Sequence, residues 1–475
     1  MRALERAEAI LDRDTFVPVA ELSPETPFVV GYGFIDGVRV ALALSDGHVK
    51  GGTIGVCESS AIAGLARGLT RAAPLGRRGG LPPVPLIIGF DTGGVRVQEG
   101  PRALAAASAV GVALARMTLL GVRLAAVISG PRGCFGAPSV MAALPERIIM
   151  TEGSHWGLTG PKLLRDIAGE GAQDAFEATS AAVRLANGDA HAVVPDTPAD
   201  IRAVLRDFVR TATVRLELPS LEERIAESAR LAARLERRFH RAVSRSHWHT
   251  SYPAPRRRRD LLRYSFRGQW EPDGTVRRHG LLQAAHGTLS GFPTSALIVG
   301  PEETRGGGVG IEEVALATEI IRQSVQHAGV LRGAIVSFLF CQGHAVDPTQ
   351  ERFGLPRVLA ECLRAMVAAR LCGHPLVSVL GGGTYGAVYL ALAAPSHRIL
   401  AMRGTSVAPM APRVLRAFEG LKGASDDADK AHQLAELIPD VHTVASVIRL
   451  PRVLHTELEE LMASVQPEPR FRPRS

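Results

Sequence analysis

The sequence predicts two tandem α/β domains whose sheets are mostly parallel and are flanked by helices. Three observations predict this fold class. The chain has 475 residues, which is more than one ordinary hydrophobic core needs. Short apolar runs that end in glycines alternate with helical patterns, as in parallel sheets connected by crossover helices. The same order of elements also occurs twice along the chain, which indicates an internal repeat.

The first half begins with a predicted hairpin. Residues 28–46 form two strand-like runs around Asp36-Gly37, a dipeptide that favours a two-residue hairpin turn. Alternating strands and helices follow. Apolar runs predict strands within 85–94, 123–130 and 147–153, and helical patterns connect them over 102–121 and 139–145.

The second half repeats that order of strand, glycine loop and helix. Strands are predicted within 333–347, 375–386 and 398–404, with helices over 356–373 and 387–395. Two copies of one domain explain this pattern best.

A charged, proline-containing segment separates the halves. Residues 220–241 have the leucine and alanine spacing of a helix, and they give way to a stretch that includes Arg256–Arg259. Such a composition cannot bury enough apolar surface to fold by itself. We therefore predict an N-terminal domain over 1–241, an Arg/Pro-rich linker over 242–262 and a C-terminal domain over 263–475.

Composition and charge narrow the function classes. The net charge of +8 invites a nucleic-acid partner, but much of it lies in the linker and the C-terminal tail. No alternation of aromatic and basic residues suggests a surface for stacking bases. A positive field also suits phosphate-bearing acyl carriers or CoA. Hence we expect no nucleic-acid partner.

Targeting and metal signals are weak. The five cysteines form no CxxC pair, and no HExxH motif occurs, so we expect no metal. The N-terminus lacks the apolar core of a signal peptide, and no apolar run is expected to reach the about 18–20 residues that span a bilayer. The longest candidate, Ala103–Leu120, is interrupted by Arg116. We expect a soluble cytoplasmic enzyme with no membrane contact.

The glycine loops are the candidate site. Backbone N–H groups that end a strand before a helix are unpaired and attract negative charge. Two such loops on neighbouring strands could aim two donors at one oxygen and form an oxyanion hole for an enolate. Alternatively, the glycines only make tight turns. The predicted catalytic positions are Gly93, Gly94, Gly136 and Ala137 in the first half, and Gly343, His344, Gly386 and Ala387 in the second.

Residues Phe90–Pro101, FDTGGVRVQEGP, resemble the DSGG/DTGG segment of the carboxyltransferase family, which is crotonase-like. Within that family, residues 1–210 are similar to the β subunit of biotin-independent malonate decarboxylase, on segments such as His48–Gly55 and Gly130–Gly153. The second half is similar to the γ subunit, on Arg305–Ile320 and Gly373–Met402. The chain thus resembles a fusion of the two subunits.

This resemblance implies a crotonase-like fold and a reaction. A malonyl thioester, or a substituted one, would lose CO2 and become an acetyl thioester, with its enolate held in an oxyanion hole. The substrate would be carried on a phosphopantetheine-type or dephospho-CoA-derived arm of an acyl carrier protein, or on CoA, and the chain itself would hold no covalent cofactor. A transferase subunit could load the carrier, and a homodimer is implied. Glycine loops of one half would hold the thioester oxygen and those of the other the carboxylate.

Several side chains could assist. His344 could deliver the proton to the enolate or serve structure alone. Tyr385 could do the same or bind the carboxylate, and we favour packing. Arg96 could orient the carboxylate, although a local ion pair with Glu99 is the simpler role. Lys50, beside Gly51 and Gly52, could contact carrier phosphates, and Gln342 could bind substrate. Cys134 and Cys341 are expected to be small buried hydrophobes.

Two alternatives remain open. Lys162, Ala137, His344 and Tyr385 differ from the family pattern. A biotin-linked acyl-CoA carboxyltransferase would need a biotin carrier. A non-catalytic scaffold subunit would have lost its chemistry.

Overall fold

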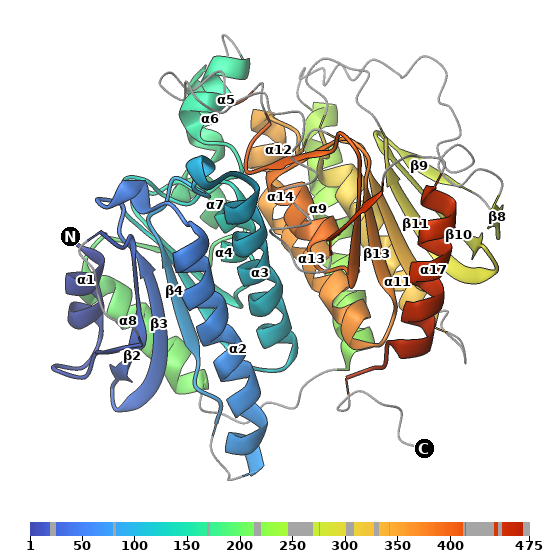
Figure 1. The fold of residues 1–475 in the computed structure, drawn as a ribbon. Coiled ribbons are helices and arrows are strands. Elements are labelled where there is room, and N and C mark those ends of the chain that lie inside the picture. Colours follow the sequence, from blue (N-terminus) through green and yellow to red (C-terminus); the bar gives the residue numbers. More distant parts are fainter. Residues whose placement is uncertain are drawn as a thin grey trace. The chain divides into compact units, whose positions relative to one another are not determined.

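The protein forms two compact units (Figure 1). The computed structural model describes residues 1–19, 25–78, 82–168, 172–212, 220–245, 269–274, 276–300, 308–326, 332–341, 343–411, 414, 441–444 and 449–468. Unit 1 comprises residues 1–99, 106–218 and 347–360, and unit 2 comprises residues 100–105, 219–346 and 361–475.

Unit 1 is built on a seven-stranded sheet. From β2 onward the strands lie in sequence order, and every pairing after the β2–β3 hairpin is parallel. The short β1 pairs antiparallel with β2. The strands are β1 (Val17–Pro18), β2 (Phe28–Ile35), β3 (Val38–Ser45), β4 (Leu86–Phe90), β5 (Leu124–Ile128), β6 (Arg147–Thr151) and β7 (Ala192–Val194).

The predicted Asp36-Gly37 hairpin is confirmed. Ile35 lies opposite Val38, and both turn residues have positive φ, +49° for Asp36 and +75° for Gly37. That conformation is the type I′ turn, whose twist matches that of the two strands. Two backbone N–H groups of the turn donate to the carboxylate of Asp12, which fixes the turn further.

Helices cover both faces of this sheet. α1 (Ala3–Ile10) and α8 (Pro198–Ala212) bury Ala7, Leu205 and Phe208 against strand residues of one face. The other helical segments of unit 1 or its borders are α2 (Val56–Arg78), α3 (Gly100–Leu119), α4 (Ala137–Ala142), α5 (Pro161–Ala168), α6 (Ala172–Ala178), α7 (Ala181–Ala186), α12 (Pro348–Arg352) and the short turns η1 (Lys50–Gly52) and η2 (Val97–Glu99).

Unit 2 repeats the plan. Its main sheet has the order β17-β15-β13-β12-β11-β10-β8, and all pairs from β11 to β17 are parallel. The strands are β8 (Trp270–Pro272), β9 (Arg277–His279), β10 (Leu282–Leu289), β11 (Phe292–Val299), β12 (Ala334–Leu339), β13 (Leu376–Leu380), β14 (Gly383–Tyr385), β15 (Arg398–Met402), β16 (Ser406–Ala408) and β17 (Val441–Val444).

The repeat extends further than the sequence analysis found. β10 and β11 form a hairpin around Ser290-Gly291, whose φ values of +52° and +85° reproduce the turn at Asp36-Gly37. The Ser-Gly dipeptide is a turn signal that could have revealed this hairpin. The predicted fold class, two α/β domains of mostly parallel sheets flanked by helices, is confirmed.

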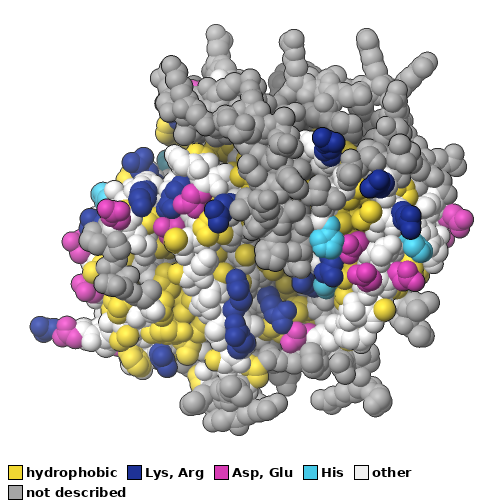
Figure 2. Space-filling model, viewed as in Figure 1, with side chains coloured by type: hydrophobic (Ala, Val, Ile, Leu, Met, Phe, Trp, Pro, Cys, Tyr) yellow, Lys and Arg dark blue, Asp and Glu magenta, His cyan; other side chains and the backbone are white. Residues whose placement is uncertain are grey.

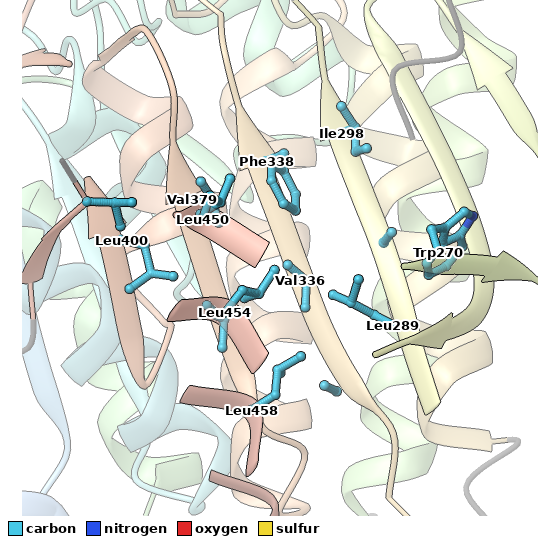
Figure 3. Close-up of a cluster of buried hydrophobic side chains, with 14 of the residues drawn as sticks. Trp270, Leu289, Ile298, Val336, Phe338, Val379, Leu400, Leu450, Leu454 and Leu458 are labelled. Atoms are coloured by element: carbon cyan, nitrogen blue, oxygen red, sulfur yellow. The ribbon is translucent and has the colours of Figure 1, made fainter. Parts of the chain in front are cut away.

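Helix α17 (Leu450–Ser464) closes one face of the second sheet. Its residues Leu450, Leu454 and Leu458 point toward Val336 and Val379 of the central strands (Figure 3). The spacing of four residues places these leucines on one side of the helix. The remaining helical segments of this part of the chain are α9 (Leu221–Arg245), α11 (Ile311–Gln326), α13 (Leu355–Leu371), α14 (Gly386–Val388) and the π-helical turn η3 (Tyr389–Ala393).

The predicted domain division meets the structure only in part. Helix α9 was assigned to the N-terminal domain, but it groups with unit 2 and packs on α11. Within the predicted linker over 242–262, residues 246–262 lie outside the described residues. The division at that linker therefore stays a prediction.

An ion-pair cluster joins α9 to the second sheet. Glu312 on α11 accepts from His240 of α9 at 2.9 Å and from His279 of β9 at 2.8 Å. The hydrogen bond and charge of Glu312 raise the pKa of His279.

Because the folded pKa of His279 is raised, its contribution to stability is present at low pH and is lost as the pH rises through that pKa, above 6.5. We expect Glu312→Gln to lower the free energy of unfolding by at most about 1 kcal/mol at pH 6, since half-exposed pairs are screened, and by less at pH 9. Amide exchange in α9 measures this. An equal loss at both pH values would contradict it.

One helix meets the length and hydropathy criteria for a membrane span. Val97–Leu119 is long and apolar enough, by length and composition, to cross a membrane. It overlaps Ala103–Leu120, the longest apolar candidate in the sequence. Most of its apolar window is buried inside the structure, as in a core helix, so the helix is weak evidence for a span.

Candidate functional site

The glycine loops of unit 1 lie side by side beyond the ends of β4 and β5. Thr92 pairs in parallel with Cys134, and the Thr92 N–H donates to the Gly133 carbonyl at 2.8 Å. Cys134 pairs in turn with Trp156, beyond the end of β6. The loops thus continue the order of the sheet and are held by backbone hydrogen bonds.

The two predicted loop positions meet at Gly94 and Gly136. A Cβ added to Gly136 would lie 3.8 Å from the Gly94 Cα, and one added to Gly94 would lie 3.5 Å from the Phe135 carbonyl oxygen. Unit 2 repeats this arrangement, because a Cβ on Gly343 would lie 3.5 Å from the carbonyl oxygen of Tyr385, the residue before Gly386.

Backbone angles confirm the correspondence. Gly94 and Gly343 have φ values of +119° and +110°, and Gly136 and Gly386 have values of +67° and +56°. The sequence pairs these four loops only by the order of elements, and the structure gives the two glycines of each pair similar φ values. Each unit therefore holds the same two-loop constellation.

The hydrogen bonds of unit 1 change the assignment of donors. The Gly93 N–H donates to the Gly51 carbonyl at 3.0 Å, Gly94 to the Thr92 hydroxyl at 3.1 Å, and Gly136 to the Leu158 carbonyl at 2.9 Å. These three N–H groups were predicted to be oxyanion donors, but they are occupied within the unit. Gly93 and Gly136 donate to carbonyls distant in sequence and Gly94 to a hydroxyl two residues away, as expected because buried N–H groups are almost always paired.

Two N–H groups of these loops remain as donors. Ala137 begins helix α4, where an N–H has no partner within the helix, and Val95 follows Gly94. Among the described residues neither N–H has a hydrogen-bond partner. Of the four predicted donors in unit 1, Ala137 is the one that stays available.

Arg96 fixes the first loop. Its guanidinium pairs with Glu58 at 3.1 Å and Glu99 at 2.6 Å, and it donates to the Thr53 carbonyl at 2.9 Å. The predicted ion pair with Glu99 is confirmed. These contacts make Arg96 a loop-positioning residue, and a role in substrate binding stays a prediction.

The same framework in unit 2 lacks the arginine. Glu58 accepts the Gly55 N–H at 2.8 Å, and Glu313 accepts the Gly310 N–H at 3.0 Å. Ala345 occupies the place of Arg96. The Arg96 N–H donates to the carbonyl of Ile54, the residue before Gly55, at 2.9 Å, and the Ala345 N–H donates to the carbonyl of Val309, the residue before Gly310, at 3.0 Å. Burial raises the pKa of Glu313. The two units therefore differ in charge beside equivalent loops, because Glu58 has the cationic partner Arg96 and the place of that arginine next to Glu313 is taken by Ala345.

The Lys50–Gly52 turn lies against the first loop. All three residues, Lys50, Gly51 and Gly52, have positive φ, and the Gly51 carbonyl accepts the Gly93 N–H. Lys50 is exposed. The turn therefore supports the candidate site from outside, and its predicted contact with carrier phosphates remains a prediction.

In unit 2, His344 and Tyr385 occupy neighbouring loops. His344 pairs in parallel with Val309, and its side chain is partly exposed. Tyr385 is buried, and its ring packs over Gly383, where a Cβ would meet the ring at 2.5 Å. This fits the packing role favoured for Tyr385. Gln342 lies outside the described residues.

Sequence reasoning missed two acids in unit 1, the partly buried Asp91 and the fully buried Glu351. Asp91 follows β4, and burial raises its pKa against a hydrogen bond from the Arg132 N–H. Glu351 on α12 accepts the N–H groups of Leu158 and Thr159 at 2.9 and 2.7 Å. The position of Asp91 at a strand end was a signal that could have been read, whereas Glu351 gave none.

Among the described residues, neither metal-ligand groups nor Cys134 nor the surface charges indicate a second candidate site. The described residues include no group of three or more His, Cys, Asp or Glu residues placed to hold a metal ion. Cys134 is fully buried, and burial raises the pKa of its thiol well above the ordinary value, which disfavours a nucleophile. Basic and acidic side chains are interspersed over the visible face (Figure 2).

The first part of the chain is similar to known carboxyltransferases. The family model of the carboxyl transferase domain matches residues 2–216. The methylmalonyl-CoA carboxyltransferase 12S subunit of Propionibacterium freudenreichii is 31% identical over 177 residues, 37% of this chain. This chain spans 31% of that relative's length.

Two further similar proteins have malonyl or malonate in their names. The malonyl-S-ACP:biotin-protein carboxyltransferase of Malonomonas rubra is 28% identical over 246 residues, 46% of this chain and 75% of that protein. A chain in the crystal structure of a Pseudomonas malonate decarboxylase hetero-dimer is 32% identical and matches 44% of this chain and 86% of its own length, with a TM-score of 0.39.

Proposed function

We propose that this chain, whose residues 2–216 match the family model of the carboxyl transferase domain, decarboxylates a malonyl thioester carried on an acyl carrier protein. The observation that carries the proposal is the two-loop constellation around Gly94 and Gly136, with the N–H groups of Ala137 and Val95 available as donors. The relative named for malonyl-S-ACP supports the substrate class.

The proposed chemistry needs charge stabilisation more than covalent catalysis. The bond between C2 and the carboxylate breaks, CO2 leaves, and the electron pair becomes an enolate whose charge falls on the thioester oxygen. Backbone N–H donors aimed at that oxygen stabilise the transition state, because negative charge grows there during the reaction. A proton then reaches C2 and gives the acetyl thioester.

The test follows the thioester itself. Purified chain would be incubated with malonyl-carrier protein and, separately, with malonyl-CoA, in the absence of biotin and ATP. We expect mass spectrometry to show conversion to the acetyl thioester with release of CO2, and the faster of the two substrates identifies the carrier. Unchanged thioester with folded protein would refute simple decarboxylation.

A second function is favoured by the names of the relatives. Two of the proteins described above are carboxyltransferases, one of them acting with a biotin protein. In that case the enolate forms by the same bond cleavage, but the carboxylate passes to biotin. Conversion of malonyl to acetyl thioester only when a biotinylated carrier is added, with the carboxyl group gained by the biotin rather than released as CO2, would favour this reaction over the first.

A further inference from the structure

Glu351 is a buried carboxylate that holds a segment of backbone. It lies on α12 within unit 1, it is fully buried, and its two oxygens accept the N–H groups of Leu158 and Thr159 at 2.9 and 2.7 Å. Two N–H groups of consecutive peptide units on one carboxylate fix the position and orientation of that backbone.

The held segment connects directly to the candidate loop. The Leu158 carbonyl accepts the N–H of Gly136, the residue before the proposed donor Ala137, at 2.9 Å. Gly157 allows the close approach of the carboxylate, since a Cβ there would lie 2.9 Å from a Glu351 oxygen. A short chain of contacts therefore runs from Glu351 through Leu158 to Gly136.

We infer that Glu351 is a positioning residue for the candidate oxyanion loop, acting through the Leu158–Thr159 backbone. Its catalytic consequence rests on the proposed function, whereas the positioning of the backbone does not. The carboxylate acts at a distance from the reacting atoms, and it sets where the Gly136–Ala137 peptide lies.

Among the described residues, two arginines near Glu351 have acidic partners of their own. Arg184 of α7 is buried, donates to the Trp156 carbonyl, and is paired with Asp189 at 3.4 Å. Arg352, the next residue on α12, pairs with Glu177 of α6 at 2.9 Å.

Burial raises the pKa of Glu351 to about 7, against the charge of Arg184 and the hydrogen bonds from Leu158 and Thr159, which favour the ionised form. Both forms are therefore populated near neutral pH.

The two forms of Glu351 differ in how they hold the loop. The ionised carboxylate accepts both N–H groups, and protonation weakens one of these bonds. We expect the protection of the Leu158 and Thr159 amides to rise with pH through about 7. The stability of unit 1 should change in the opposite direction, because an acid whose folded pKa is raised destabilises the fold as it ionises between 4.5 and about 7.

The experiment compares Glu351→Gln with wild type by hydrogen–deuterium exchange, at pH 6 and pH 8. The amide NH2 of glutamine would face one of the N–H donors, so one hydrogen bond is lost at every pH. We expect the protection of residues 157–160 to fall about tenfold at pH 8 and to lose its pH dependence. The turnover number should fall in parallel, while KM changes little.

Glu361→Gln is the matched control, because Glu361 is also buried but pairs with Arg364 on α13 in unit 2. It should leave the protection of residues 157–160 unchanged. Wild-type protection that is independent of pH, or retained in Glu351→Gln, would overturn the inference. Altered protection without any thioester turnover in wild type would instead leave the positioning intact and refute the proposed function. If Glu351→Gln does not fold, the pH dependence in wild type decides.

Discussion

Replacing Gly136 with alanine is expected to lower the rate of thioester decarboxylation at least about 100-fold, which is the effect of losing one oxyanion donor. Gly136 has φ +67° and ψ −147°, a combination that is essentially restricted to glycine. There is room for a methyl group, since the nearest heavy atoms would be 3.8 and 3.9 Å away. The loss would therefore come from a shifted backbone, which moves the Ala137 N–H, rather than from a steric clash.

A matched control separates this effect from general strain. Gly37 also has positive φ, at +75°, and an added Cβ would meet nothing within 4 Å. It lies in the β2–β3 turn and not in the candidate loops. We expect Gly37→Ala to destabilise the hairpin by about 1 kcal/mol and to leave turnover unchanged. Equal losses of turnover in both variants, with folding confirmed by circular dichroism, would remove Gly136 from the mechanism.

Replacing Arg96 with methionine is expected to lower the free energy of unfolding of unit 1 by about 3 kcal/mol, because it leaves a buried carboxylate uncompensated. The Glu58 side chain is only 4% exposed and loses its ion pair, and the Thr53 carbonyl loses a hydrogen bond. The double variant Arg96→Met/Glu58→Gln should recover more than half of the loss, since the unpaired charge is gone. The denaturant dependence of amide exchange in β4 and β5 measures these values.

The control for Arg96 is an exposed ion pair of the same unit. Arg206 pairs with Asp36 at 3.0 Å with about half of its side chain exposed. Surface pairs contribute about 0–1 kcal/mol, so Arg206→Met should have a small effect. If Arg96→Met costs no more than Arg206→Met, Arg96 does not fix the loop.

Local chemistry made much of the fold predictable. The Asp36-Gly37 turn, the apolar runs of β4, β5 and β6 and their counterparts β12, β13 and β15 appear where the patterns placed them. The hairpin at Ser290-Gly291 was missed although its turn signal was present. Helix α9 groups with unit 2, whereas the sequence placed it at the end of the N-terminal domain, because a helix pattern does not say which sheet the helix packs on.

The site was predictable as a set of loops but not as a set of donors. Strand order brings Gly94 beside Gly136, and that order follows from short right-handed connections. Which N–H groups stay available depends on distant partners, such as the Leu158 carbonyl that takes up the Gly136 N–H. Glu351 is 193 residues away from Leu158 in sequence, and no spacing rule connects them.

The central claim, that the loops of unit 1 stabilise the enolate of a thioester, is tested most directly by proton exchange. Acetyl-carrier protein in D2O would exchange its C2 protons if the enzyme forms the enolate from the product side, by microscopic reversibility. We predict deuterium incorporation with the wild-type chain and little with Gly136→Ala. Folded wild-type protein that gives no exchange with either acetyl-carrier protein or acetyl-CoA would contradict the claim.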